Sequence, residues 1–292
     1  MPSLREFNER LASMAGMRRV TGTMKLVAAS HLHRVQSELS KPESFARSLA
    51  ALEKLIFQPR FEQSRYRLPP PDRGSRILLV VMSSDRGLCG GFNGAVIRAV
   101  RAFHEEQAAR APKKIDHLYV GQKAFQVLKE RFPALGGAPL PASSHPTVKD
   151  SDRVAKRIVR LFHWRFYDEI WLASNRFINS MTNECRTERL LPDARPPVPK
   201  VQARPMPLPR LIEPNDDRLL EALTYQWIQL SLYFAMLHSA TGELAARVVA
   251  MDNSTMNLNA MEKELRTRRN RARQAAITNE LTEIVSGAEA LN

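Results

Sequence analysis

The chain has 292 residues, of which 43% are hydrophobic and 25% charged, the composition of an ordinary globular protein. It contains no apolar run of eighteen residues, which excludes a typical membrane span, and its two cysteines are too few for a disulfide framework. The formal charge of +14 implies an acidic partner, which could be nucleic acid, a lipid surface or a carboxylate-rich protein. The first residues lack a secretory core and include early acids, so we expect a cytosolic protein.

The N-terminal segment has the pattern of a coiled-coil helix. Ser3 and Glu6 have the spacing of a capping box, and the helical pattern then runs to about Lys41. Residues of two heptad series follow: Leu4, Leu11, Leu32 and Leu39, and Phe7, Met14, Thr21, Ala28 and Val35. Arg18 and Lys25 interrupt the first series, and polar residues in a seam usually fix register at a cost in stability. We assign residues 1–58 to an N-terminal coiled-coil helix.

The middle of the chain alternates strand-like and helix-like segments. A proline-rich linker, 59–74, precedes the continuous apolar run Arg76–Met82, which is typical of a strand buried on both faces. Further strands are predicted at 115–121 and 167–174, with another at 187–191, and helices at 93–106, 122–131 and 151–165. This alternation predicts a small Rossmann-like α/β domain with a mainly parallel sheet at residues 75–192.

A glycine-rich turn, residues 84–93, follows the first predicted strand. It has neither the phosphate-loop nor the dinucleotide-binding spacing of glycines, so a structural turn with positive φ at Gly87, Gly90 or Gly91 is favoured over a nucleotide site. Cys89 lies in this turn beside the apolar run and is expected to be a buried structural thiol. Cys185 has Arg186 next to it, which could lower the pKa of its thiol.

The last quarter of the chain predicts one very long helix. No proline follows Pro214, and apolar residues, mostly leucine, recur every seven positions from Leu223 to Leu265. A second series runs four residues behind, from Trp227 to Thr255. About 75 helical residues would extend about 110 Å. We assign residues 210–292 to a C-terminal helix, which must pair antiparallel with the N-terminal helix if the middle folds beside one end.

The densest charge in the chain lies near the end of this helix. The basic cluster consists of Lys263, Arg266, Arg268, Arg269, Arg271 and Arg273. It could be a solvated surface, a nucleic-acid site or a contact for acidic protein loops, and the last is favoured over DNA because no aromatic residues interleave it. Beyond it, apolar residues from Ile277 to Leu291 form a stripe with no N-terminal partner, so we expect that stripe to bury itself in another protein. The histidines show no ligand spacing, so no metal site is predicted, and no catalytic arrangement is identifiable.

Several motifs resemble those of the gamma subunits of F-type ATP synthases. They are the segments 24–30, 85–93, 246–255 and 271–288, with Asn175-Arg176-Phe177 and Leu190-Leu191-Pro192 in the middle. Their order and spacing hold over the whole chain. Gly16-Met17, Arg19-Val20 and Ile212 depart from the family pattern, which indicates a somewhat divergent member. The lack of a transit peptide and of a cysteine-bearing regulatory insert favours a bacterial one.

The resemblance implies a rotor subunit that is not itself an enzyme. In this family the terminal helices form an antiparallel coiled coil inside a hexamer of alpha and beta subunits, and the α/β domain stands on the c-ring beside the epsilon subunit. Rotation of the ring is thereby coupled to ATP synthesis or hydrolysis in the beta subunits. No cofactor, metal or nucleic acid is implied. The expected location is the cytoplasmic face of a bacterial membrane, reached only through the complex.

The resemblance also implies a set of contact residues. Residues that match positions of coupling and contact with the beta subunits are Met24, Arg247, Gln274, Thr278 and Glu280, with Arg266, Arg269 and Arg273 facing acidic beta loops. Glu213 matches a contact with the c-ring and epsilon. Two competing functions stay open from the residues themselves: a nucleic-acid-binding coiled-coil protein that uses the arginines, and a small α/β enzyme that uses the glycine turn.

Overall fold

The computed structural model describes residues 4–39, 76–110, 114–192 and 216–289. The chain divides into two compact units, a terminal unit of residues 1–28 with 247–292 and a central unit of residues 29–246. The predicted linker 59–74, residues 40–58 of the N-terminal segment, and Glu213 and Leu291 lie outside the described residues.

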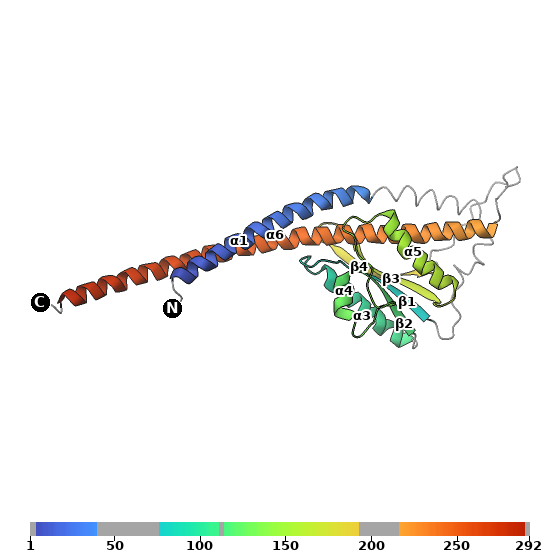
Figure 1. The fold of residues 1–292 in the computed structure, drawn as a ribbon, viewed down its shortest axis with the longest axis horizontal. Helices are drawn as coiled ribbons and strands as arrows, with labels where there is room; N and C mark the ends of the chain where they lie inside the picture. The colour runs from blue at the N-terminus through green and yellow to red at the C-terminus, as the bar shows by residue number, and fades with distance from the viewer. Residues whose placement is uncertain (1–3, 40–75, 111–113, 193–215, 290–292) are drawn as a thin grey trace. The chain divides into compact units, whose positions relative to one another are not determined.

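A four-stranded sheet forms the middle of the central unit (Figure 1). Its strands are β1 (Arg76–Met82), β2 (Lys114–Val120), β3 (Glu169–Phe177) and β4 (Asn183–Leu191), in the order β2-β1-β3-β4. β1 is parallel to both of its neighbours, and β4 is antiparallel to β3. The predicted α/β fold with a mainly parallel sheet is thus confirmed. β4 begins at Asn183 rather than at the predicted residue 187 because it continues a hairpin from β3, whose turn is closed by hydrogen bonds between Asn179 and Thr182.

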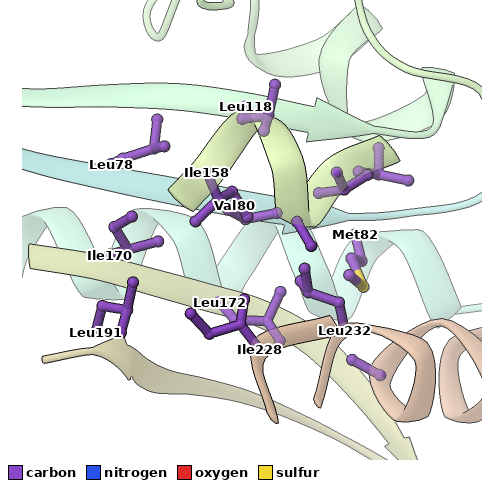
Figure 2. Close-up of a cluster of buried hydrophobic side chains, with 14 of the residues drawn as sticks. Leu78, Val80, Met82, Leu118, Ile158, Ile170, Leu172, Leu191, Ile228 and Leu232 are labelled. Carbon is purple, nitrogen blue, oxygen red and sulfur yellow. The ribbon is translucent and has the colours of Figure 1, made fainter. Parts of the chain in front are cut away.

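Helices cover both faces of this sheet, which explains the unbroken apolar run of β1. Ile77, Leu79 and Val81 pack in the core under α3 (Phe92–Arg110) and α4 (Gln122–Leu128). Leu78, Val80 and Met82 point to the other face, where α5 (Val148–His163) and α6 (Asp216–Glu289) pack (Figure 2). All six of these side chains are buried. Successive side chains of a strand point to opposite faces of the sheet, so alternate residues of this uniformly apolar strand lie in two different cores.

α5 begins three residues earlier than predicted. Thr147 and Asp150 form a capping box, in which the Asp150 carboxylate accepts hydrogen bonds from the backbone N–H and the hydroxyl of Thr147. This box satisfies N–H groups that the helix itself leaves unpaired, so the helix starts at Val148.

The two long helices pair antiparallel. Within the terminal unit, α1 (Leu4–Glu38) and α6 are joined by Lys25–Asp252, Thr21–Thr255 and Arg18–Asn259 hydrogen bonds of 2.6, 2.9 and 3.3 Å. Residue numbers rise on one helix as they fall on the other. The pairing continues past Leu265, the last residue of the predicted seven-residue series, because Arg269 still reaches Asn8 across 3.5 Å.

The predicted heptad series is the buried side of α6. Its first five members, Leu223, Leu230, Leu237, Leu244 and Met251, are buried, and Leu258 and Leu265 are half-buried. In the central unit, Leu237 and Leu244 pack with Val35 of α1. Within the described part of the chain, no helix has the length and apolarity needed to cross a membrane.

Candidate functional site

The seam of the terminal unit contains a polar cluster. Glu262 is only 7% exposed, and its two carboxylate oxygens lie 3.4 Å from the Arg18 guanidinium and 2.6 Å from that of Arg266. Two turns along α1, Lys25 pairs with Asp252 at 2.6 Å. The two cations that interrupt the heptad series are thus each matched by an acid of the opposite helix, an arrangement that specifies the register of the pairing.

The predicted arginine contacts fall into two groups. Arg266 and Arg269 are engaged within the chain, by Glu262 and by Asn8, respectively. Arg273 is exposed, and so is Arg271, which lies between Arg269 and Arg273 in the sequence. Arg268 forms an ion pair with Glu264 along the helix surface. Arg269 therefore links α6 to α1, whereas Arg266 pairs with an acid one turn back on α6 itself. The outer part of the cluster is directed to solvent.

An exposed polar ledge follows the basic cluster. Gln274, Thr278 and Glu280 are all exposed on α6. The Thr278 hydroxyl donates to the Gln274 backbone carbonyl at 3.0 Å, so these two residues lie one turn apart on the same side. The adjacent tip of the helix exposes four large apolar side chains: Ile277, Leu281, Ile284 and Val285. Apolar side chains gathered in this way on a helix beside polar groups are typical of a protein contact surface.

The remaining predicted site residues lie apart from this ledge. Met24 and Arg247 are half-buried members of the terminal unit, and Met24 is the chain neighbour of the Lys25–Asp252 pair. The candidate residues do not converge on one pocket. They are distributed along α1 and α6, as a contact surface for an enclosing partner would be.

The glycine-rich turn uses its polar groups within the chain. The two oxygens of the Asp85 carboxylate accept hydrogen bonds from the backbone N–H groups of Gln122 and Ala142, both at 3.1 Å, and Gln122 is the first residue of α4. Of the three glycines predicted to have positive φ, only Gly90 has it. Leu88 is another residue of the turn with positive φ. Cys89 is buried, as predicted. These contacts favour the structural turn over the nucleotide site.

Two histidine pairs in the central unit were not predicted from the sequence. His31 Nδ1 lies 2.6 Å from His145 Nε2, and His104 Nε2 lies 2.8 Å from His117 Nε2. The ring centroids of the two pairs are 4.7 and 5.0 Å apart, and one nitrogen of each contact donates a hydrogen bond to the other, with the tautomer deciding which. Each pair joins residues distant in sequence or on different elements, which no spacing rule detects.

Burial dominates the ionisation of these groups. It lowers the pKa of His117 to about 4, with His104 acting in the same direction and Asp116 against it. The pKa of His145 is also lowered, first by burial and then by His31 and Arg34. The suggestion that Arg186 lowers the pKa of Cys185 is wrong, because burial raises this pKa to about 11. The residues that the structure describes contain no group of three or more potential metal ligands.

Comparisons with known proteins agree with this arrangement. The family model described as ATP synthase matches residues 3–291. The ATP synthase gamma chain of Geotalea uraniireducens is 33% identical over 100% of this chain and 99% of its own, and that of Geobacter metallireducens is 34% identical over the same shares.

Solved structures show the same fold. A chain of the Euglena gracilis mitochondrial ATP synthase, from a structure of OSCP, F1 and c-ring, has a TM-score of 0.68 and 18% identity, covering 99% of this chain and 94% of its own. A chain of the Tetrahymena thermophila central stalk and c-ring has a TM-score of 0.60 and 24% identity, covering 80% of this chain and 98% of its own. With the full-length match to curated gamma chains, these findings establish that the chain belongs to the gamma chain family of ATP synthases.

Proposed function

We propose that the chain is the central-stalk rotor subunit of an ion-translocating F-type ATP synthase, without an active site of its own. The observation that carries this function is the match to gamma chains at 33–34% identity over the full length. Its partners are the alpha and beta subunits, the epsilon subunit and the c-ring. Its association with the membrane is peripheral and runs through the complex, on the cytoplasmic face in a bacterial cell.

The paired helices supply the mechanical element of this function. Rotation couples two sites only if the shaft resists twisting and presents different faces to the three catalytic sites. The buried apolar series of α6 and the ion pairs of Arg18 and Lys25 support a shaft of fixed register. We assign residues 1–58 and 210–292 to the shaft and residues 75–192 to the domain on the ring.

The exposed ledge and tip of α6 supply the contact with the hexamer. Gln274, Thr278 and Glu280 would offer hydrogen-bonding groups to the beta subunits, and Arg273 would face acidic loops. Arg269 would act mainly by holding α1 against α6, and Arg266 by orienting Glu262, which pairs with Arg18 of α1. Met24 and Arg247 would transmit torque along the shaft, and Glu213 would contact the c-ring and epsilon.

Co-expression with alpha and beta subunits tests the proposal. We expect one copy of the chain to co-purify with each alpha–beta hexamer and to support ATP hydrolysis. A matched control chain that ends at Arg273 keeps most of the helix pair but lacks the ledge and tip, and should be retained poorly. Failure of the full chain to enter the hexamer would overturn the rotor function, and tight, salt-sensitive DNA binding by the free chain would favour the nucleic-acid alternative.

A further inference from the structure

One surface of the central unit is not used by the proposed function. The inner side of α5 buries Val154, Ile158 and Phe162 in the core. The opposite side carries cations at intervals of four, three and four residues, and all of them are exposed: Lys149, Arg153, Lys156 and Arg160. We refer to these four residues as the α5 stripe. Such intervals keep residues on one side of a helix, and eleven residues extend about 16 Å.

The α5 stripe ends at two exposed aromatic residues. Trp164, the C-cap of α5, is 61% exposed, and Phe166 is 48% exposed. Their ring centroids are 6.1 Å apart, and the Arg160 guanidinium lies 5.9 Å from the centroid of the Trp164 ring. Arg165 between them has a φ of 55°, so the chain turns sharply at this point. The fold itself does not require these large apolar rings to face solvent.

The neighbouring acids only partly neutralise the stripe. Asp152 forms an ion pair of 2.7 Å with Lys156 and also accepts a hydrogen bond from Tyr225. Asp150 is engaged in the capping box at the start of α5. Within the described ranges, Lys149, Arg153 and Arg160 have no ion-pair partner, so the surface keeps a net positive charge.

We propose that the α5 stripe, with Trp164 and Phe166, docks on the headgroup surface of an anionic lipid bilayer. A straight row of cations on one helix side matches a flat anionic plane, to which each Lys or Arg near the surface is attracted. Tryptophan and phenylalanine are favoured at the level of the headgroups, where an apolar ring and a polar surface meet. The apolar face of α5 is already buried in the core, so the contact is peripheral and the helix does not insert.

An acidic protein surface fits these residues less well. Half of the α5 stripe is lysine, a residue depleted in protein–protein interfaces, and the row is extended along the helix instead of being grouped around a central anchor. The lipid contact goes beyond the proposed function, in which the chain meets the membrane only through its partners. Its failure would leave the rotor function intact, because assembly with the hexamer is measured separately.

Binding of the full chain to vesicles tests the lipid contact. We expect the chain to float with vesicles of phosphatidylglycerol and phosphatidylcholine at physiological salt, and not with phosphatidylcholine alone. The variant K149Q/R153Q/K156Q/R160Q should bind at least tenfold more weakly. The matched control R10Q/R19Q/K263Q/R271Q removes the same charge from exposed positions of the terminal unit and should bind within about twofold of the parent. Circular dichroism verifies that both variants keep their helices.

Tryptophan fluorescence tests the aromatic part of the contact. Emission of the parent should shift to shorter wavelength on adding anionic vesicles, and Trp164→Phe should lose the shift while Trp171 and Trp227 remain. Equal loss of binding in the two four-charge variants would overturn the proposal, because net charge alone would then explain it. Unchanged vesicle binding by the stripe variant together with loss of subunit assembly would also overturn it and would identify an acidic protein as the partner.

Discussion

Glu262 is a buried carboxylate between two arginines, and its energetic role differs from that of an exposed ion pair. Replacement by glutamine keeps the shape but leaves Arg18 and Arg266 facing a neutral group in the seam. We expect Glu262→Gln to lower the free energy of unfolding by about 1–3 kcal/mol. Asp252→Asn, in the more exposed pair with Lys25, should cost less than about 1 kcal/mol. Urea unfolding of the full chain measures the free energy of unfolding of both variants. Equal losses would contradict the expected difference between the buried and the more exposed ion pair.

His117 makes the central unit sensitive to acid. Because its folded-state pKa is lowered to about 4, the stability that its neutral form contributes is fully present above the ordinary pKa near 6.5 and is lost as the pH falls toward 4. This linkage amounts to about 3 kcal/mol. In His117→Gln the titrating group is absent, so the free energy of unfolding should fall less between pH 7 and pH 4 than in the parent.

Fluorescence-detected unfolding at several pH values measures this difference, since Trp171 packs against Phe103 in the same core. The control His33→Gln removes an exposed ring from α1 and should keep the acid sensitivity of the parent. If His117→Gln were as acid-sensitive as the parent, the buried His117 ring would not be the source of the acid sensitivity. The sequence gives no sign of this pair, because His104 and His117 lie on different elements and meet only after α3 packs on β2.

At the scale of elements, the periodicity of apolar residues predicted the helices and strands that a local pattern defines. The heptads identified α1, α6 and their buried sides, and the apolar run identified β1. Boundaries were less accurate where a distant contact sets them. β3 starts at Glu169 rather than at Tyr167, whose hydroxyl instead donates to Asp116 at the edge of the sheet. Such contacts join residues more than fifty positions apart, and no local pattern contains them.

Leu237 tests the heptad assignment of α6. It is 1% exposed and packs with Val35 and Leu244. Leu237→Asp would bury an unpaired charge in this cluster, and we expect a loss of about 3 kcal/mol or more in the free energy of unfolding. Leu281→Asp makes the same change on the exposed tip and should alter it by less than about 0.5 kcal/mol. A thermal melt of Leu237→Asp that matches the parent would refute the assignment.

At the scale of the whole molecule, the candidate site is a surface that only a partner completes. The sequence indicated an exposed apolar tip after the basic cluster, and Ile277, Leu281 and Ile284 are indeed exposed. It did not indicate that Arg269 is used inside the helix pair, because its partner Asn8 comes from α1, whereas Arg266 pairs with Glu262 at the i, i+4 spacing of a single helix. Residue type and spacing therefore predicted where the surface lies, and tertiary contacts decide which of its charges remain available.

The ledge formed by Gln274 and Thr278 allows coupling to be separated from folding. Both side chains are exposed, so the double variant Gln274→Ala with Thr278→Ala should change the free energy of unfolding by less than about 0.5 kcal/mol. Loss of the hydrogen bonds that we propose they make to the beta subunits should nevertheless reduce ATP synthesis by the reconstituted complex several-fold. The control Asn257→Ala with Thr267→Ala changes two exposed residues on the same helix, and Thr267 donates a similar hydrogen bond to the carbonyl of Lys263. Synthesis rates and helicity are compared for both variants. Proportional loss of helicity and synthesis in the ledge variant, or an equal loss of synthesis in the control, would show that the ledge acts through folding and not through contact.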